Sequence, residues 1–301
     1  MPFMKTGGAR LAVALLAAAL LTGCAPNDSH TPAPSRTAAT TPAAESFKQL
    51  EQRFGARLGV YVLDTGSGRE VTYRADERFA FASTSKALAV GALLRHSSDA
   101  DLDQVVAYRS EDLQKWAPIT SKHVDTGMRL RELAAASLQY SDNTAANLVM
   151  DRLGGPDALQ QELRGLGDTT TDVNRTEPTL NEATPGDPRD TSTPRVLAAD
   201  LRRFVLGDIL PDARRQLLTD WLLGNTTGAP YIRAGVPAGW KVGDKTGNGG
   251  YGTRNDIAVA WPDGGGSPVV IAVLSDRGRA DATSDDALIA RATKAALSTL
   301  R

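Results

Sequence analysis

The sequence has very few of the residues that build covalent cross-links and metal centres. One cysteine, Cys24, occurs in 301 residues, so no disulfide can form within the chain and a cysteine-built zinc or iron–sulfur site is excluded. The three histidines, His30, His96 and His123, are scattered and lack the spacing of a metal site. We therefore expect an activity that uses neither a metal nor another cofactor.

An excess of charge of one sign and long apolar runs are also missing. The 34 Lys and Arg residues nearly balance 35 Asp and Glu residues, and the net charge of -1 is not that of a nucleic-acid binder. The longest N-terminal apolar run, Leu11–Leu21, is shorter than the roughly 20 residues that cross a bilayer. With 41% hydrophobic and 23% charged residues, the composition is that of a globular protein.

The first residues have the features of an export signal. Lys5 and Arg10 supply positive charge, and the apolar run follows them. The run ends in Leu21-Thr22-Gly23-Cys24, which resembles the lipobox of bacterial lipoproteins, where cleavage leaves the cysteine to be lipidated. The alternative is an ordinary secretory signal with an incidental cysteine. We predict a signal peptide over residues 1–23 and an exported protein, anchored to the membrane through Cys24 or secreted.

A segment almost without large apolar residues separates this signal from the rest of the chain. Residues 24–45 are crowded with Pro, Thr, Ser and Ala, and they cannot bury enough surface to offset their ordering entropy. We predict a disordered tether over residues 24–45 and one folded domain over residues 46–301.

Patterns typical of strands lie at both ends of this domain. Leu58–Leu63 is followed by a turn and by a possible hairpin partner, Val71–Tyr73. Two more β-rich stretches, Asp256–Trp261 and Pro268–Ser275, lie near the C-terminus and are separated by a glycine-rich turn. The C-terminal residues Ser284–Leu300 are predicted to form an amphipathic helix.

Helical patterns fill the middle of the domain. They are Ser83–Arg95, Arg129–Gln139, Thr144–Leu153 and Arg195–Val205. We therefore predict an α+β fold, in which an antiparallel sheet built from both termini is flanked by helices and carries an all-helical insert. The α/β part would cover about residues 46–80 and 225–301 and the helical part about 81–224, with a ligand cleft between them.

Three short motifs carry groups suited to nucleophilic catalysis. They are Ser83-Thr84-Ser85-Lys86, Ser141-Asp142-Asn143 and Lys245-Thr246-Gly247. At i and i+3 on a helix, Ser83 and Lys86 share a face and are close enough to hydrogen-bond, and a desolvated lysine can take the proton of a serine. Each motif also has an ordinary structural interpretation: a helix N-cap for the first two, and the end of a strand for the third.

The order of these motifs along the chain resembles that of the penicilloyl-serine transferases, which comprise penicillin-binding proteins and serine β-lactamases. A fourth element lies between the second and third motifs. The segment from Glu177 to Asn181 resembles the Glu-x-x-x-Asn loop of class A β-lactamases. The resemblance covers nearly all of the predicted domain, and it implies the β-lactamase and D-alanyl-D-alanine-peptidase type of fold.

The resemblance also implies a catalytic role for each matching residue. Ser83 would be the acylated nucleophile with Lys86 as its neighbouring base, and Ser141 would pass a proton to the β-lactam nitrogen. Glu177 and Asn181 would hold the hydrolytic water, and Lys245 would face the substrate carboxylate. Whether Glu177 or Lys86 acts as the base in acylation stays open.

Other matching residues would bind substrate or stabilise the loop. The implied substrate-binding residues are Asn143, Lys245, Thr246, Gly247, Asn248, Arg254 and Trp116, with the backbone N–H groups of Ser83 and Asn248 as the oxyanion hole. Arg175 and Asp190 would form an ion pair that joins the two ends of the Glu177 loop. Trp116 is expected at the cleft entrance, or alternatively in the core.

The resulting expectation is a monomeric class A serine β-lactamase that hydrolyses penicillins and cephalosporins and gives antibiotic resistance. Its partners would be small β-lactam substrates, with no nucleic acid, and a membrane contact only through lipidated Cys24. Two alternatives remain open: a cell-wall D-alanyl-D-alanine peptidase, which Glu177 argues against, and a non-catalytic β-lactam sensor or surface lipoprotein.

Overall fold

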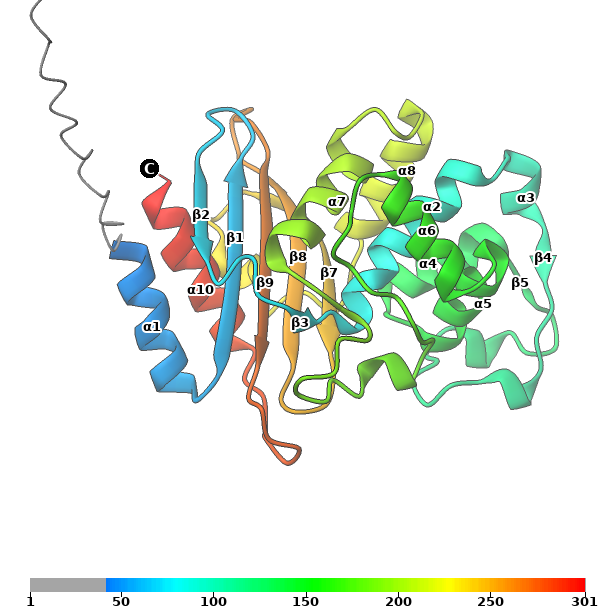
Figure 1. The fold of residues 1–301 in the computed structure, drawn as a ribbon. Coiled ribbons are helices and arrows are strands. Elements are labelled where there is room, and N and C mark those ends of the chain that lie inside the picture. The colour runs from blue at the N-terminus through cyan, green and yellow to red at the C-terminus, as the bar shows by residue number, and fades with distance from the viewer. Residues whose placement is uncertain (1–41, 301) are drawn as a thin grey trace, which may run out of the picture. The chain divides into compact units, whose positions relative to one another are not determined.

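Five antiparallel strands form the main sheet of the protein (Figure 1). The structure is a computed structural model and describes residues 42–300. In spatial order the strands are β2 (Glu70–Tyr73), β1 (Arg57–Asp64), β9 (Val269–Asp276), β8 (Arg254–Trp261) and β7 (Lys241–Asn248). Because β1 and β2 come from the start of the described chain and β7 to β9 from its end, the predicted α+β architecture is confirmed.

Helices lie on both sides of this sheet (Figure 1). Those with ten or more residues are α1 (Pro42–Phe54), α2 (Ser85–His96), α4 (Leu130–Gln139), α5 (Asn143–Leu153), α6 (Pro156–Gly165), α7 (Pro194–Leu206), α8 (Asp212–Leu223) and α10 (Ala287–Thr299). The short helices are α3 (Asp99–Asp103) and α9 (Ile232–Gly235). No helix in the described part of the chain is both long and apolar enough to cross a membrane.

The two faces of the sheet are packed against different helices. Along β1, Leu58 and Val60 belong to one buried cluster with residues of α1 and α10. Tyr61 and Leu63 belong to a second cluster that includes α7 and the helices beyond it. Successive side chains of a strand point to opposite faces of the sheet. A strand that is covered on both faces, as β1 is, therefore needs apolar residues on both faces and shows no apolar–polar alternation.

Helix α1 begins at Pro42, so its first four residues, Pro42 to Glu45, fall inside the range predicted as tether. Proline at the start of a helix presets the helical φ and needs no N–H partner, and alanines follow it in this chain. The helix thus begins within the last four residues of the range that we predicted as tether. The predicted signal peptide, Cys24 and the rest of the tether lie outside the described residues.

Short elements between the sheet and the helical part position the functional motifs. β3 (Phe79–Ala80) pairs with β6 (Thr191–Ser192), and a 3₁₀ turn, Ala82–Thr84, leads directly into α2. β4 (Val105–Val106) pairs with β5 (Met128–Arg129) at the far end of the helical part. Further 3₁₀ turns are Ser110–Asp112, Thr120–Lys122 and Thr179–Asn181.

Candidate active site

Three elements bring the sequence motifs to one cavity. The turn before α2 carries Ser83, the connection between α4 and α5 carries Ser141, and β7 carries Lys245 and Thr246. The cavity has a volume of about 310 Å³ and is lined by Ser83, Trp116, Ser141, Asn143, Asn181, Thr227, Thr246 and Asn248. It lies between the sheet and the helical part, where the sequence predicted a ligand cleft.

Ser83 is buried in the 3₁₀ turn before α2, after a strained residue. Ala82 has φ +49°, in the left-handed region that residues with a Cβ rarely adopt. The Ser83 hydroxyl donates a hydrogen bond to Glu177 Oε1 at 3.0 Å. Lys86 Nζ lies 2.9 Å from the same oxygen. The direct Ser83–Lys86 hydrogen bond that the helical spacing suggested is therefore replaced by a contact of both groups with Glu177.

Lys86 connects the first motif to the second. Its Nζ donates to Asn143 Oδ1 at 2.6 Å and to the carbonyl oxygen of Ser141 at 2.9 Å. The side chain is 3% exposed. Burial lowers the pKa of Lys86 from its ordinary value, against the opposing effect of the nearby Glu177 carboxylate.

The Ser141 hydroxyl lies between two lysines. Lys245 Nζ donates to Ser141 Oγ at 3.0 Å, and Lys86 Nζ approaches the same oxygen at 3.4 Å. Burial and then repulsion from Lys86 lower the pKa of Lys245 to about 7. A hydroxyl with two amines at hydrogen-bonding distance can receive a proton from one side while it donates its own proton to the other.

Asp142 keeps the second motif in place. Its carboxylate caps α5 by accepting the N–H of Ala145 at 2.9 Å. The same carboxylate accepts the N–H of Ile119 and of Thr120, each at 2.9 Å. The helix-cap interpretation is thus correct for Asp142, while the residues on either side of it, Ser141 and Asn143, face the cavity.

Glu177 is 4% exposed and is held by its backbone and its side chain. Asn147 accepts the Glu177 N–H through Oδ1 at 2.9 Å, and its Nδ2 donates to the Glu177 carbonyl oxygen at 2.9 Å. Asn181 Nδ2 donates to Glu177 Oε2. Asn147 was not predicted, yet it follows Asn143 by one helical turn, and that spacing places both amides on one face of α5.

The loop that carries Glu177 is closed by an ion pair. Arg175 Nε lies 2.5 Å from Asp190 Oδ2, and Asp190 is fully buried. Asp190 Oδ1 also accepts the backbone N–H groups of Asn174 and Arg175. Because this carboxylate is buried and hydrogen-bonded, the pair is not the solvated surface contact that contributes little.

The mouth of the cavity contains one predicted and one unpredicted residue. Trp116 is 56% exposed and its Nε1 donates to the carbonyl oxygen of Tyr140, so the alternative of a core tryptophan is wrong. Thr227 was missed, and its hydroxyl lies 2.6 Å from Thr246 Oγ1. No feature of the sequence around Thr227 indicates this contact.

Two further predicted residues lie along the β7–β8 ladder. Asn248 lines the cavity and its Oδ1 accepts a hydrogen bond from Tyr231. Arg254 is the strand partner of Asn248, but it is not among the cavity-lining residues. Its Nε lies 3.0 Å from Asp286 Oδ1.

Comparison with known proteins identifies relatives over almost the entire described chain. Residues 42–300 match the model of the β-lactamase enzyme family. A β-lactamase of Bacillus licheniformis is 54% identical, with 96% of this chain and 94% of that protein covered. The crystal structure of a halotolerant bacterial β-lactamase is 54% identical with a TM-score of 0.84, over 85% of this chain and 98% of that chain.

A class A β-lactamase from Clostridium kluyveri is also similar, with 48% identity, a TM-score of 0.84 and coverage of 85% of this chain and 98% of that chain. The described fold, the cavity and these relatives agree. The chain therefore belongs to the β-lactamase enzyme family, as a class A serine β-lactamase.

Proposed function

We propose that this β-lactamase hydrolyses penicillins and cephalosporins in two steps through an acyl-enzyme on Ser83, and so gives resistance to these antibiotics. One observation carries the proposal: Glu177 Oε1 is 3.0 Å from the Ser83 hydroxyl and 2.9 Å from the Lys86 amine. A serine is a weak nucleophile until a neighbouring base removes its proton, and here one candidate base, Glu177, contacts both Ser83 and the other candidate base, Lys86.

In the acylation step, Ser83 Oγ attacks the lactam carbonyl carbon while its proton moves to Glu177 or to Lys86. Burial lowers the pKa of Lys86, which is the direction that a proton-accepting amine needs. The carbonyl oxygen becomes an oxyanion, for which the backbone N–H groups of Ser83 and Asn248 are the proposed donors. When the C–N bond breaks, the Ser141 hydroxyl gives its proton to the nitrogen and regains one from an adjacent lysine.

Substrate binding is assigned to the other side of the cavity. Lys245, with the hydroxyl of Thr246 and with Gly247, is proposed to bind the carboxylate of the substrate. Arg254, at the partner position of Asn248, would add positive charge beside the cavity. The Asn143 amide is proposed to bind the acylamino side chain, and the exposed Trp116 ring to cover the cavity mouth.

Deacylation distinguishes a hydrolase from a protein that stays acylated. Glu177 is proposed to remove a proton from a water molecule that attacks the Ser83 ester, with Asn181 as the second group that orients this water. Asn181 Oδ1 is buried and has no hydrogen-bond partner among the described residues, which supports a role in binding a small polar molecule. The products are the ring-opened acid and free Ser83.

The test of these roles uses two variants and measures turnover and covalent mass. Ser83→Ala should lose hydrolysis of a chromogenic cephalosporin by at least about 10³-fold and form no adduct. Glu177→Gln should become acylated and keep the adduct. Glu111→Gln, with a side chain 73% exposed, is the control and should behave as wild type. Normal turnover by Ser83→Ala, or normal deacylation by Glu177→Gln, would refute the assigned roles.

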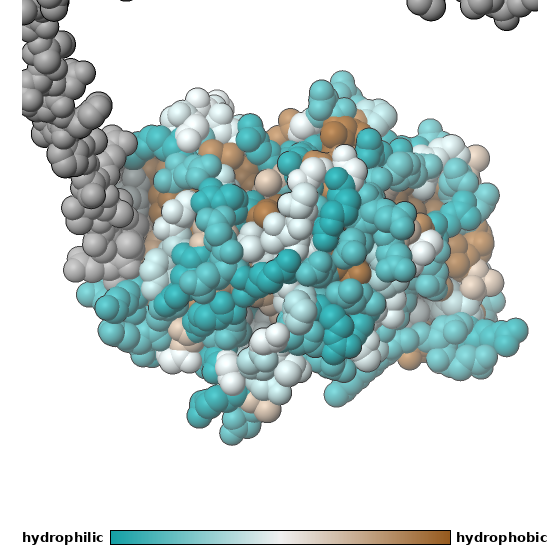
Figure 2. Space-filling model, in the orientation of Figure 1, coloured by the Kyte–Doolittle hydropathy of each residue, from teal (hydrophilic) through white to brown (hydrophobic). Residues whose placement is uncertain are grey.

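The location in the cell and the assembly state are proposed on sequence and surface features. Cleavage after residue 23 would leave Cys24 as a lipid-bearing N-terminus, with a tether before the catalytic domain. A monomer is supported by a surface that is mostly hydrophilic on the face in Figure 2, with apolar side chains in small patches. Mass spectrometry of the membrane fraction tests the anchor: a mature chain that begins elsewhere and carries no lipid would contradict it.

A further inference from the structure

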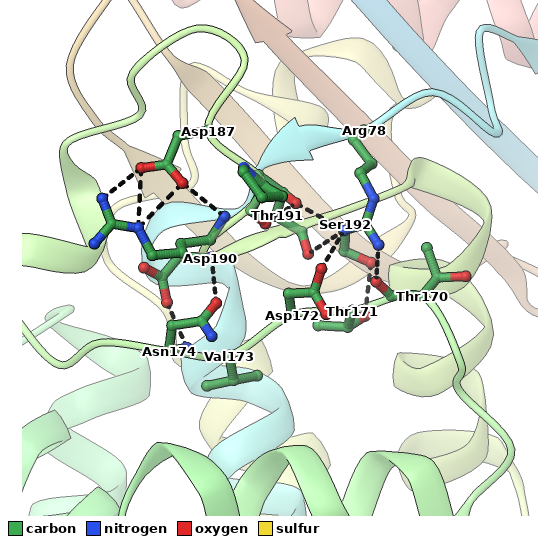
Figure 3. Close-up of polar contacts among 12 residues, drawn as sticks. Arg78, Thr170, Thr171, Asp172, Val173, Asn174, Asp187, Asp190, Thr191 and Ser192 are labelled. Atoms are coloured by element: carbon green, nitrogen blue, oxygen red, sulfur yellow. Dashed lines mark hydrogen bonds and ion pairs between the residues drawn. The ribbon is translucent and has the colours of Figure 1, made fainter.

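One arginine outside the cavity contacts both ends of the loop that carries Glu177 (Figure 3). Arg78 Nη2 donates to the carbonyl oxygen of Thr170 at 2.6 Å, and its Nη1 lies 3.0 Å from Asp172 Oδ2. On the other limb, Nη1 donates to Thr191 Oγ1 at 2.8 Å. Thr170 and Asp172 precede Glu177 and Thr191 follows it, so one guanidinium spans the base of the loop.

The backbone next to Arg78 binds the second limb of this loop directly. Ala80 of β3 is paired with Thr191 of β6, and the N–H of Phe81 donates to the carbonyl oxygen of Asp190 at 3.0 Å. The first limb is joined to the second by the Asp172 N–H, which donates to the Thr191 carbonyl oxygen at 3.0 Å. Arg78 adds a side-chain connection from the β3 segment to the first limb.

A residue of the main sheet holds the backbone of Arg78 in place. Arg57 of β1 donates through Nη2 to the Arg78 carbonyl oxygen at 2.9 Å, and the same nitrogen lies 2.7 Å from Asp276 Oδ2 of β9. The Arg57 guanidinium also lies over the Phe79 ring, 3.8 Å from its centroid. The segment that follows Arg78 reaches Ser83 after five residues. One short segment, fixed to the sheet, thus carries the nucleophile and holds the loop of Glu177.

We propose that Arg78 is a positioning residue for deacylation, which keeps Glu177 at its working distance from the Ser83 ester. The proposal rests on the role of Glu177 proposed above. The Arg78 side chain is 40% exposed, so its ion pair with Asp172 alone would contribute little to stability. Its effect comes from geometry, because the planar guanidinium has donors in fixed directions and reaches partners on both limbs, which a lysine ammonium does not reproduce.

The experiment compares acylation and deacylation rate constants of wild type, Arg78→Ala and Arg78→Lys, with Arg109→Ala as control. The Arg109 side chain is 81% exposed and lies far along the chain from the loop. Arg78→Ala should acylate within about twofold of wild type and deacylate about tenfold more slowly, because small displacements of a catalytic group are costly to rate. The deacylation rate constant of Arg78→Lys should lie between those of Arg78→Ala and wild type, and that of Arg109→Ala should match wild type.

A merely structural role would lower the melting temperature and leave the ratio of the two rate constants unchanged, and that result would overturn the proposal. If Arg78→Ala does not fold, the same ratio in Arg78→Lys decides the question. Glu177→Gln is measured in parallel. If it deacylates normally, the proposed role of Glu177 fails; if it stalls while both Arg78 variants keep the wild-type ratio, only the role of Arg78 fails.

Discussion

The two buried lysines of the site are close together but differ in their partners. Lys86 pairs with Glu177 Oε1 at 2.9 Å, whereas Lys245 donates to two neutral oxygens, Ser141 Oγ and the Thr246 carbonyl oxygen. Burial lowers the pKa of both lysines, and the charge of Lys86 lowers the pKa of Lys245 further. A substrate carboxylate would restore the charge of Lys245, so substrate binding and protonation of this amine are coupled.

This coupling predicts a pH dependence. The pKa of Lys245 is lowered to about 7 in the free enzyme, so the cation is present below that pH and is lost as the pH rises through it. For a β-lactam with a carboxylate, kcat/KM should therefore fall on the alkaline side, and kcat should change less. Lys245→Arg keeps its charge at all these pH values and should move the alkaline limb to higher pH. Identical alkaline limbs in the two enzymes would contradict this explanation.

At the scale of elements, the contact between β7 and the turn before α2 determines where Ser83 lies. A Cβ added at Gly247 of β7 would lie 2.8 Å from the carbonyl oxygen of Phe81 and 3.1 Å from the backbone nitrogen of Thr84. These atoms flank Ser83 on both sides in the sequence. The strand and the turn approach this closely because glycine has no side chain at that position.

We therefore expect Gly247→Ala to displace the Ser83 turn while the fold is kept. The turnover of a chromogenic cephalosporin should fall by about 10-fold or more, since reacting groups tolerate only small displacements. Gly165→Ala at the end of α6 is the matched control, because its added Cβ meets no atom within 4 Å. Turnover and melting temperature are measured for both variants, and equal turnover in the two would show that the close approach is not needed.

Among the long helices and the strands of the main sheet, the predicted segments correspond to β1, β2, β8, β9, α2, α4, α5, α7 and α10, whereas α1, α6, α8 and β7 were not predicted individually. The hairpin of β1 and β2 was expected, and the register of Val62 opposite Val71 confirms it. The helix predicted over Thr144–Leu153 is α5, and it ends as predicted at Leu153, before Gly154 with φ +99°. In contrast, the bounds of β7 were not predicted, because buried Asp244, Lys245 and Thr246 give it no alternation of apolar residues.

At the scale of the whole molecule, two neighbouring buried acids lie on α7 and on the segment before the Glu177 loop. Asp168 Oδ1 accepts the N–H groups of Thr170 and Thr171, and Arg203 Nη1 donates to Asp200 Oδ1 at 2.5 Å. The Oδ2 atoms of Asp168 and Asp200 are both buried without a partner among the described residues. Burial, followed by the charge of Asp168, raises the pKa of Asp200 to about 8.

The raised pKa of Asp200 determines how the stability of the protein changes with pH. The folded protein keeps a proton on Asp200 that the unfolded chain releases near pH 3.8, so the free energy of unfolding falls as the pH rises from about 4 to about 8. Asp200→Asn cannot ionise and should gain stability relative to wild type across that window. Melting temperatures at both ends of it, with the exposed Asp212→Asn as control, provide the test. If the difference in melting temperature between Asp200→Asn and wild type does not change with pH, the pKa of Asp200 is not raised.

The sequence by itself determined the architecture and the family, and it predicted most of the candidate site residues, because strand and helix patterns are local and the four motifs occur in a recognisable order. Only the tertiary structure decided how those groups meet. It replaced the expected Ser83–Lys86 contact by a shared contact with Glu177, and it revealed Asn147 and Arg78 as residues that hold the Glu177 loop. The physical reason is that such contacts join segments far apart in the chain, and a one-dimensional pattern contains no distances between them.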